Sequence, residues 1–304
     1  MDAMKKFIRK IVLFALLIGA ILILLEVSVR SVPNEYSYKY EYLEKNITEI
    51  KVLSLGSSAA RSGIAPDVFP INAFNVAQVS QDLETDCAII HKYIERADSL
   101  KYVFFPILPM AYSYRMGEGV EDWRLRKYPI YMNLDVEKPA ISDRFELSNF
   151  PGSVGQIIKY LKGEKTVDCY KKGMGDDDVV ENEEKKISQG VMIAGIHNEH
   201  FYRENYEIIV PVLENTIELC AKHDVKIVLI VLPCYYTYCE NIEPLMVSEC
   251  DSISRKIVEN HSNVTYFNWF TDSTFVSEDF RNSNHLSQAG AKKLTNRIIQ
   301  LLGL

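Results

Sequence analysis

The feature that most constrains the fold is a repeated alternation of short apolar runs with longer helical patterns. The apolar runs are five in number and cover 50–55, 74–77, 102–108, 227–232 and 264–268. Helical spacing of apolar residues is found at 83–97, 206–221, 242–258 and 288–302. Strands that are continuously apolar, joined by helices, are typical of a parallel sheet covered on both faces. The sequence therefore predicts an α/β domain whose ligands bind at the carboxyl ends of the strands.

A long segment at about 111–200 interrupts this alternation. It contains Trp123, several tyrosines and a run of six acids, and it is too long for a simple loop in a compact domain. The acids are Asp176, Asp177, Asp178, Glu181, Glu183 and Glu184. We expect an insertion with one or two helices, the clearest at 154–161, that lies over the strand ends. The acidic run is expected to be a solvated loop, with a cation site at 176–178 as the less favoured alternative.

The N-terminus carries an apolar run at 11–25 without a charge or a strongly polar side chain. With its flanks the apolar body covers 7–29, which is long enough to cross a lipid bilayer once. Four cations precede the run, whereas Glu26 and Arg30 follow it and cancel, so we expect a cytoplasmic N-terminus and an exported remainder. A cleaved signal peptide is the alternative, but no small-x-small pattern follows the run. We expect residues 1–30 to be an uncleaved signal anchor.

Composition excludes several classes of protein. With 47% hydrophobic and 25% charged residues the chain is not disordered, and its net charge of −7 leaves no basic surface for nucleic acid. The six cysteines show no metal spacing. Cys87 and Cys220 are expected to be buried fillers, while Cys234 and Cys239 are close enough to form a disulfide.

Tyrosines alternate with polar residues in the segment 31–49, which follows the apolar run. They stand at 36, 38, 40 and 42. A period of two predicts an edge strand or an extended stalk along the domain.

Two segments far apart in the chain carry residue types suited to acyl chemistry. The first strand ends in Gly56-Ser57-Ser58, which places a hydroxyl at the carboxyl edge of the sheet, beside helix amides that can stabilise an oxyanion. An ordinary turn or a helix cap is the alternative for this segment. His285 lies just before the last helix, where Ser287 is the expected N-cap, and it can reach the same edge. A serine needs such a base because its free hydroxyl is a weak nucleophile.

Together these segments resemble the SGNH/GDSL hydrolase superfamily, in the membrane-anchored branch similar to bacterial D-alanine-transfer and glycan O-acyltransfer proteins. Gly56-Ser57-Ser58 resembles the first family block, 74–81 the second, and Asn282 to His285 the last. The resemblance covers 50–304 apart from the insertion. It implies a three-layer flavodoxin-like sheet, Ser58 as nucleophile and His285 as base. The oxyanion donors would come from Ser58, Ala77 and Gln78.

Three departures from the family pattern bear on activity. Ser57 replaces an Asp that transfers no proton, and 104–109 stands where the third block, with its oxyanion donor, is expected. Asn282 stands where the triad has an Asp. An amide carries no charge to stabilise an imidazolium, and this change costs roughly ten-thousandfold in a serine triad. Asp279, or else Glu278 or Asp272, takes the acid's role, or the pair Ser58 and His285 acts alone, or the chain is not an efficient enzyme.

The favoured interpretation is a single-pass protein of the bacterial inner membrane with an exported esterase or O-acyltransferase domain that acts on an envelope polysaccharide. The alternative is a weakly catalytic or non-catalytic accessory protein that binds a glycan or a membrane acyltransferase partner. A soluble cytoplasmic hydrolase is opposed by the anchor. Expected partners are the lipid bilayer, through 7–29, and an envelope glycan or an acyl-donor protein. No cofactor and no metal is expected, since His197 and His200 lack a third ligand. Tyrosines at 235, 236 and 238 line a sugar subsite or simply pack.

Overall fold

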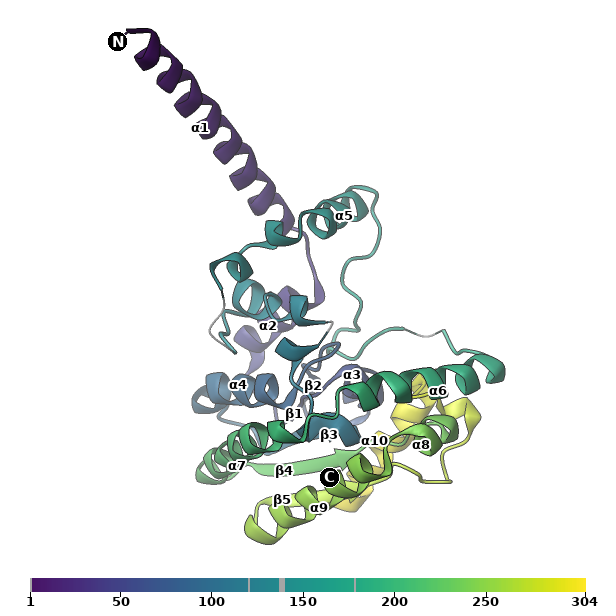
Figure 1. The fold of residues 1–304 in the computed structure, drawn as a ribbon. Coiled ribbons are helices and arrows are strands. Elements are labelled where there is room, and N and C mark those ends of the chain that lie inside the picture. The colour runs from purple at the N-terminus through teal and green to yellow at the C-terminus, as the bar shows by residue number, and fades with distance from the viewer. Residues whose placement is uncertain (1, 120, 137–139, 178) are drawn as a thin grey trace. The chain divides into compact units, whose positions relative to one another are not determined.

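The computed structural model describes residues 2–119, 121–136, 140–177 and 179–304 (Figure 1). The chain forms two compact units. The first consists of Met1–Tyr38 and Arg126–Val167, and the second of Lys39–Leu125 and Asp168–Leu304.

The second unit is built on a five-stranded sheet in which every neighbouring pair of strands is parallel. In spatial order the strands are β2 (Ala73–Asn75), β1 (Val52–Ser54), β3 (Tyr102–Ile107), β4 (Lys226–Val231) and β5 (Val264–Asn268). The order 2-1-3-4-5 is that of flavodoxin-like sheets. Nearly every residue of β1 to β4 is buried, as expected for strands covered on both faces. The predicted parallel α/β sheet is therefore confirmed.

Helices connect the strands and cover the sheet (Figure 1). They are α3 (Ser58–Gly63), α4 (Leu83–Tyr93), α7 (Tyr206–Lys222), α9 (Pro244–Asn260) and α10 (Gln288–Leu302). α3 packs on α10, and α4 packs on α7. Because the connections between parallel strands are right-handed and the strand order reverses between β1 and β3, these two pairs cover opposite faces. The four helices predicted from apolar spacing are all present, and the side chains of Asp82 and Ser287 cap α4 and α10.

The tyrosine-rich segment is a helix, α2 (Glu35–Asn46), so the prediction of an edge strand or stalk is wrong. Its buried positions are 36, 39 and 43, and position 47 directly after the helix continues this helical spacing. Lys39, whose Nζ donates to the carbonyl of Ala77, occupies one of these positions. The alternation of tyrosines therefore concealed a helical stripe that includes a buried lysine.

The segment 111–200 is divided between the two units. α5 (Phe150–Leu161) contains the predicted helix and belongs to the first unit, while α6 (Glu183–Glu199) belongs to the second. α6 packs closely on α8 (Tyr236–Asn241) at Gly190, where a Cβ atom would lie 2.0 Å from Thr237 Oγ1. Single turns make up much of the remainder. In and next to the segment 111–200 these turns are Pro109–Tyr112, Met116–Glu118, Asp122–Arg124, Tyr128–Met132, Ile141–Arg144 and Glu146–Asn149. Similar turns in the rest of the chain are Pro66–Val68, Ile94–Arg96, Arg203–Asn205 and Ser277–Asp279.

The first unit begins with α1 (Asp2–Arg30), which is long and apolar enough to span a membrane. None of the six cysteines, all of which lie among the described residues, forms a disulfide. Cys87 and Cys220 are buried, as predicted. Cys234 and Cys239, which are close enough in sequence to pair, are not bonded to each other, and the Cys239 thiol is directed at the carbonyl oxygens of Cys234 and Phe270.

Candidate active site

Ser58 lies directly after the turn that ends β1. Gly56 has a φ of +106°, and a Cβ atom there would lie 2.7 Å from the carbonyl oxygen of Pro106, so this turn requires glycine. The Gly56 N–H donates to Asp86 Oδ1 at 2.9 Å. Ser58 is the first residue of α3, and its own N–H has no preceding helical carbonyl to bind. The turn thus places the hydroxyl and an amide of the first helical turn at the carboxyl edge of the sheet.

His285 meets Ser58 although 227 residues separate them in the chain. Its Nε2 atom lies 2.8 Å from Ser58 Oγ. The predicted proximity of the two side chains, within about 4 Å, is confirmed. The loop that carries His285 precedes α10, whose N-cap is Ser287 as expected. The catalytic roles of these residues remain a prediction, which the geometry supports.

Asn282 occupies the position beside the other ring nitrogen, with its Oδ1 atom 2.9 Å from His285 Nδ1. The same oxygen accepts the backbone N–H groups of Asn284 and His285, at 3.3 and 3.0 Å. Backbone amides can only donate, so the atom that faces them is the oxygen. The Nδ1 atom must then carry the ring proton, and Nε2 is left free to accept the proton of Ser58. Asn282 therefore fixes the tautomer that a general base requires.

The three acids considered as substitutes for Asn282 are engaged elsewhere or make no described contact with the ring. Asp279 forms an ion pair with Lys293 at 2.5 Å, and Asp272 forms one with Arg297 at 2.5 Å. Glu278 contributes its backbone carbonyl to Ser287 Oγ. Among the described residues, the partner of His285 Nδ1 is an amide and not a carboxylate.

The surroundings of His285 oppose its protonation. Burial lowers its pKa to about 3, assisted by the positive charges of Arg281 and Arg61 and by His197, while Asp177 acts in the opposite direction. Asp177 lies between the two arginines, 2.9 Å from Arg61 Nη1 and 3.0 Å from Arg281 Nη1. The ring is therefore neutral at physiological pH.

The acidic run thus departs in part from the solvated loop that we expected. The side chain of Asp177 is 53% exposed yet binds both arginines. The carboxylate of Glu183, at the start of α6, accepts the hydroxyl of Ser277 at 2.5 Å and that of Tyr235. The alternative cation site at 176–178 includes Asp178, which lies outside the described residues.

The predicted oxyanion donors differ in availability. The Ala77 N–H donates to Asn75 Oδ1 at 3.1 Å, so this amide already has an acceptor, which disfavours Ala77 as an oxyanion donor. Gln78 is tied to the Ser58 turn by its backbone N–H, which donates to the Gly56 carbonyl at 3.1 Å. Its Nε2 group is buried and has no hydrogen-bond partner among the described residues. A buried donor without a partner is costly, so Gln78 and the Ser58 N–H are the better candidates.

Ser58 opens onto a cavity of about 150 Å³ within the second unit. Its lining combines the β1 turn, the start of α4, the end of β3 and α6. The polar lining residues are Ser57, Ser58, Ser80, Gln81, Asp82, Asp86, Tyr114, Glu121, His197, His200 and Asn284. This volume suits a small acyl group or part of a sugar.

Several of these lining residues were not singled out as site residues from the sequence. Burial raises the pKa of Asp86 to about 8, which keeps this carboxyl largely protonated at neutral pH. Ser80 has a φ of +59°, which is unusual for a residue other than glycine. The alternation of glutamine, serine and aspartate in 78–82 was the available signal, since it follows a strand end.

His197 lies on α6, His200 follows the last residue of α6, and both line the cavity. His197 Nδ1 is 2.7 Å from the hydroxyl oxygen of Tyr238, and burial lowers its pKa to about 4. Within the described part of the chain, no group of three or more His, Cys, Asp or Glu side chains could hold a metal ion. Tyr235 and Tyr238 are buried and pack, whereas Tyr236 is 50% exposed.

Comparisons with known proteins leave the family open. No protein-family model matches the chain, and no curated protein matches it. A solved structure from Streptococcus pneumonia, provisionally described as a platelet activating factor, is 11% identical with a TM-score of 0.44 and covers 96% of this chain and 99% of its own. A second solved structure, from Bacteroides fragilis NCTC 9343 and provisionally described as an acylhydrolase, is 11% identical with a TM-score of 0.41. It covers 86% of this chain and 94% of its own. These similarities are too distant to carry a functional argument, which therefore rests on the geometry of the site.

Proposed function

We propose that this chain is a membrane-anchored serine esterase or O-acyltransferase that acts on an ester of a cell-envelope polysaccharide. One observation carries the proposal. Ser58, His285 and Asn282 form a continuous hydrogen-bonded series at the carboxyl edge of a parallel sheet, and the serine faces a cavity. Ligands of such sheets bind at this edge.

The proposed reaction follows from the protonation states derived above. Ser58 Oγ attacks the acyl carbon while its proton passes to His285 Nε2, and the Ser58 N–H and Gln78 Nε2 stabilise the oxyanion. His285 then gives this proton to the leaving hydroxyl of the glycan, which leaves an acyl group on Ser58. Water, or a second hydroxyl in the transferase, attacks the acyl group in the reverse sequence and restores the serine.

Asn282 makes this reaction slower but not ineffective. In serine triads the Asp-to-Asn change is severe because it favours the wrong tautomer of the histidine. Here two backbone N–H groups hold the amide oxygen toward Nδ1, so the correct tautomer is kept. What is missing is only the negative charge that would stabilise the imidazolium.

The membrane part of the proposal rests on α1. The helix is apolar along 11–25 and is preceded by Lys5, Lys6, Arg9 and Lys10, a distribution that favours a cytoplasmic N-terminus. The catalytic unit would then lie outside the cytoplasm of a bacterium, where envelope polysaccharides are exposed.

The test is hydrolysis of 4-nitrophenyl acetate and of an O-acetylated polysaccharide by the full chain in detergent. We expect hydrolysis by the parent and none above background with Ser58→Ala. Ser62→Ala is the matched control, because this serine lies one turn later on α3 and outside the cavity lining. Equal rates for the parent and Ser58→Ala would contradict the enzymatic function.

The accessory function remains a second candidate because Asn282 supplies no charge to the imidazolium. An accessory protein would bind the polysaccharide or an acyltransferase without cleaving an ester. It predicts that Ser58→Ala retains full binding and that the parent shows no hydrolysis, so the same two proteins distinguish the candidates.

A further inference from the structure

Exposed apolar side chains collect in one short region of the first unit, from 141 to 161. Ile141 is 83% exposed and Leu161 is 78% exposed. The group comprises Ile141, Phe145, Phe150, Ile158, Tyr160 and Leu161. Large apolar residues gathered in this way mark an interaction surface.

α5 supplies most of this surface and is amphipathic. Phe150, Val154, Ile157 and Leu161 recur at intervals of three and four and form one stripe along the helix, exposed at Phe150 and Leu161 and half-buried at Val154 and Ile157. Lys159 stands two residues before Leu161, which places it on the opposite side at 3.6 residues per turn. Lys162 and Lys165 follow the helix, and the segment 150–165 contains a single acid, Glu164. An apolar stripe with flanking lysines is typical of a helix that lies in the interface of a membrane.

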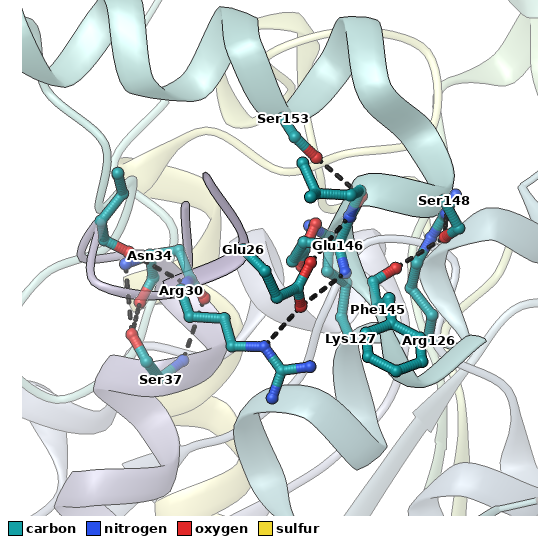
Figure 2. Close-up of polar contacts among 12 residues, drawn as sticks. Glu26, Arg30, Asn34, Ser37, Arg126, Lys127, Phe145, Glu146, Ser148 and Ser153 are labelled. Carbon is teal, nitrogen blue, oxygen red and sulfur yellow. Dashed lines mark hydrogen bonds and ion pairs between the residues drawn. The ribbon is translucent and has the colours of Figure 1, made fainter. Parts of the chain in front are cut away.

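Polar contacts fasten this region to the end of α1, as Figure 2 shows. The Glu26 carboxylate accepts the backbone N–H groups of Glu146 and Leu147, at 3.1 and 3.0 Å, and the Nε–H of Arg30 at 2.6 Å. Ser153 Oγ, in the first turn of α5, donates to the Glu146 carbonyl at 2.6 Å. Glu26 is the first charged residue after the apolar run of α1. The start of α5 is therefore held at the level where α1 would leave the bilayer.

We propose that the surface formed by residues 141–161 lies in the headgroup region of the membrane that α1 spans. The occupant of this surface is the lipid leaflet itself. Its identity follows from continuity with α1 through Glu26, and the lysines that flank the apolar stripe suit anionic headgroups. The inference rests on the proposed membrane anchor but not on the proposed catalysis.

The experiment places single tryptophans in the full chain, reconstituted in vesicles of phosphatidylcholine and phosphatidylglycerol. Some vesicles contain lipids brominated near the headgroup end of the acyl chains, and bromine quenches tryptophan fluorescence at close range. The variants are Leu161→Trp on the proposed surface, Lys159→Trp on the opposite side of α5, and Leu17→Trp in the middle of α1. The added signal is the difference from the parent, which has Trp123 and Trp269. Only variants with the parent's thermal unfolding transition are compared.

We expect bromine to remove roughly half of the added fluorescence of Leu161→Trp and much less of that of Lys159→Trp, since an interfacial helix buries only one face. Lipids brominated deep in the bilayer should quench Leu17→Trp more strongly. Quenching of Leu17→Trp without quenching of Leu161→Trp would overturn the inference and leave the anchor intact. Absence of quenching at both positions would contradict the anchor as well. If Leu161→Trp is shielded from both bromine and aqueous acrylamide, protein covers the surface and the lipid proposal is wrong.

Discussion

The Lys127–Glu146 pair in the first unit and the Ser58–His285–Asn282 series in the second are both buried polar arrangements, but they are made of different groups. Lys127 Nζ lies 2.6 and 2.8 Å from the two oxygens of the Glu146 carboxylate, and the two side chains are 8% and 3% exposed. In this pair, each buried charge is next to a buried charge of the opposite sign. The series at Ser58 contains no charged group at neutral pH and ends in a hydroxyl that faces a cavity.

This difference separates a structural role from a chemical one. A buried ion pair must stay complete, because the loss of one partner leaves the other charge without water or counter-ion. In the neutral series, Ser58 can give its proton to His285 Nε2, because this nitrogen is not held in an ion pair and is free to accept. The following predictions test this contrast, in order of decreasing effect.

The largest effect is expected at the Ser58–His285–Asn282 series. His285→Ala should lower kcat/KM for ester hydrolysis by about a thousandfold or more, because Ser58 loses the base that removes its proton. The thermal unfolding midpoint of His285→Ala should stay close to that of the parent. His261→Ala, a histidine outside the cavity lining, is the matched control. A loss of less than about tenfold would mean that His285 is not the base.

Breaking the Lys127–Glu146 pair should affect stability and not catalysis. Lys127→Met leaves the Glu146 carboxylate buried and unpaired, which we expect to cost about 3–5 kcal/mol in that unit. Amide hydrogen exchange in 126–153 should become about a hundredfold faster or more, while ester hydrolysis stays unchanged. The double variant Lys127→Met/Glu146→Met should recover most of the protection. Equal protection in the single variant and the parent would show that the pair is not a structural element.

Introducing a charge into the neutral series should sharpen the comparison. Asn282→Asp keeps an oxygen acceptor for Nδ1–H and adds a negative charge beside the imidazolium. We expect the hydrolysis rate to rise by on the order of tenfold, since an adjacent opposite charge raises a histidine pKa by about 1–3 units. Asn282→Ala should lower the rate, because it removes the group that holds the tautomer. An unchanged rate in both variants would exclude a role for residue 282.

The smallest effect is expected from pH. Because His285 has a pKa of about 3, it stays a free base throughout mildly acidic solution, and kcat/KM should vary less than about twofold between pH 7.5 and 5. An ordinary histidine, with a pKa near 6.5, would lose roughly thirtyfold at pH 5. A loss of that size in the parent would contradict the neutral environment of the ring.

The free energy of unfolding, unlike kcat/KM, should change clearly as the solution becomes acidic. A pKa below the unfolded value means that the unfolded chain binds the proton first, so stability falls as pH drops below about 6.5. His197, with a pKa of about 4, contributes in the same direction. Thermal unfolding between pH 7.5 and 4 measures this decline, and a midpoint that rises with acidity would contradict it.

The sheet could be predicted from the sequence because its signal is local and strong. The strand at 264–268 was predicted with the bounds found in the structure. The buried strands β1 to β4 carry the continuous apolar runs that are typical of parallel strands between helices. The meeting of Ser58 with His285 followed from the rule that strand ends share one edge. By contrast, α2 was missed because a lysine occupies one of its buried positions.

The remaining site residues depend on contacts that the sequence does not express. His197 reaches the cavity only because α6 packs on α8 at Gly190, a long-range contact without a local pattern. The engagement of the Ala77 N–H depends on where the side chain of Asn75 points, and the unsatisfied Nε2 group of Gln78 is apparent only from its burial. The orientation of Asn282 depends on backbone N–H groups within its own loop, which become visible only in three dimensions.

The most direct test of the central claim is covalent labelling of the full chain with a fluorophosphonate, followed by mass spectrometry to locate the adduct. Such probes react with a serine only when a base activates it. The account predicts a single adduct on Ser58 that is absent in Ser58→Ala and strongly reduced in His285→Ala. Absence of an adduct on Ser58 in the parent, or equal labelling in His285→Ala, would contradict an activated serine at this site.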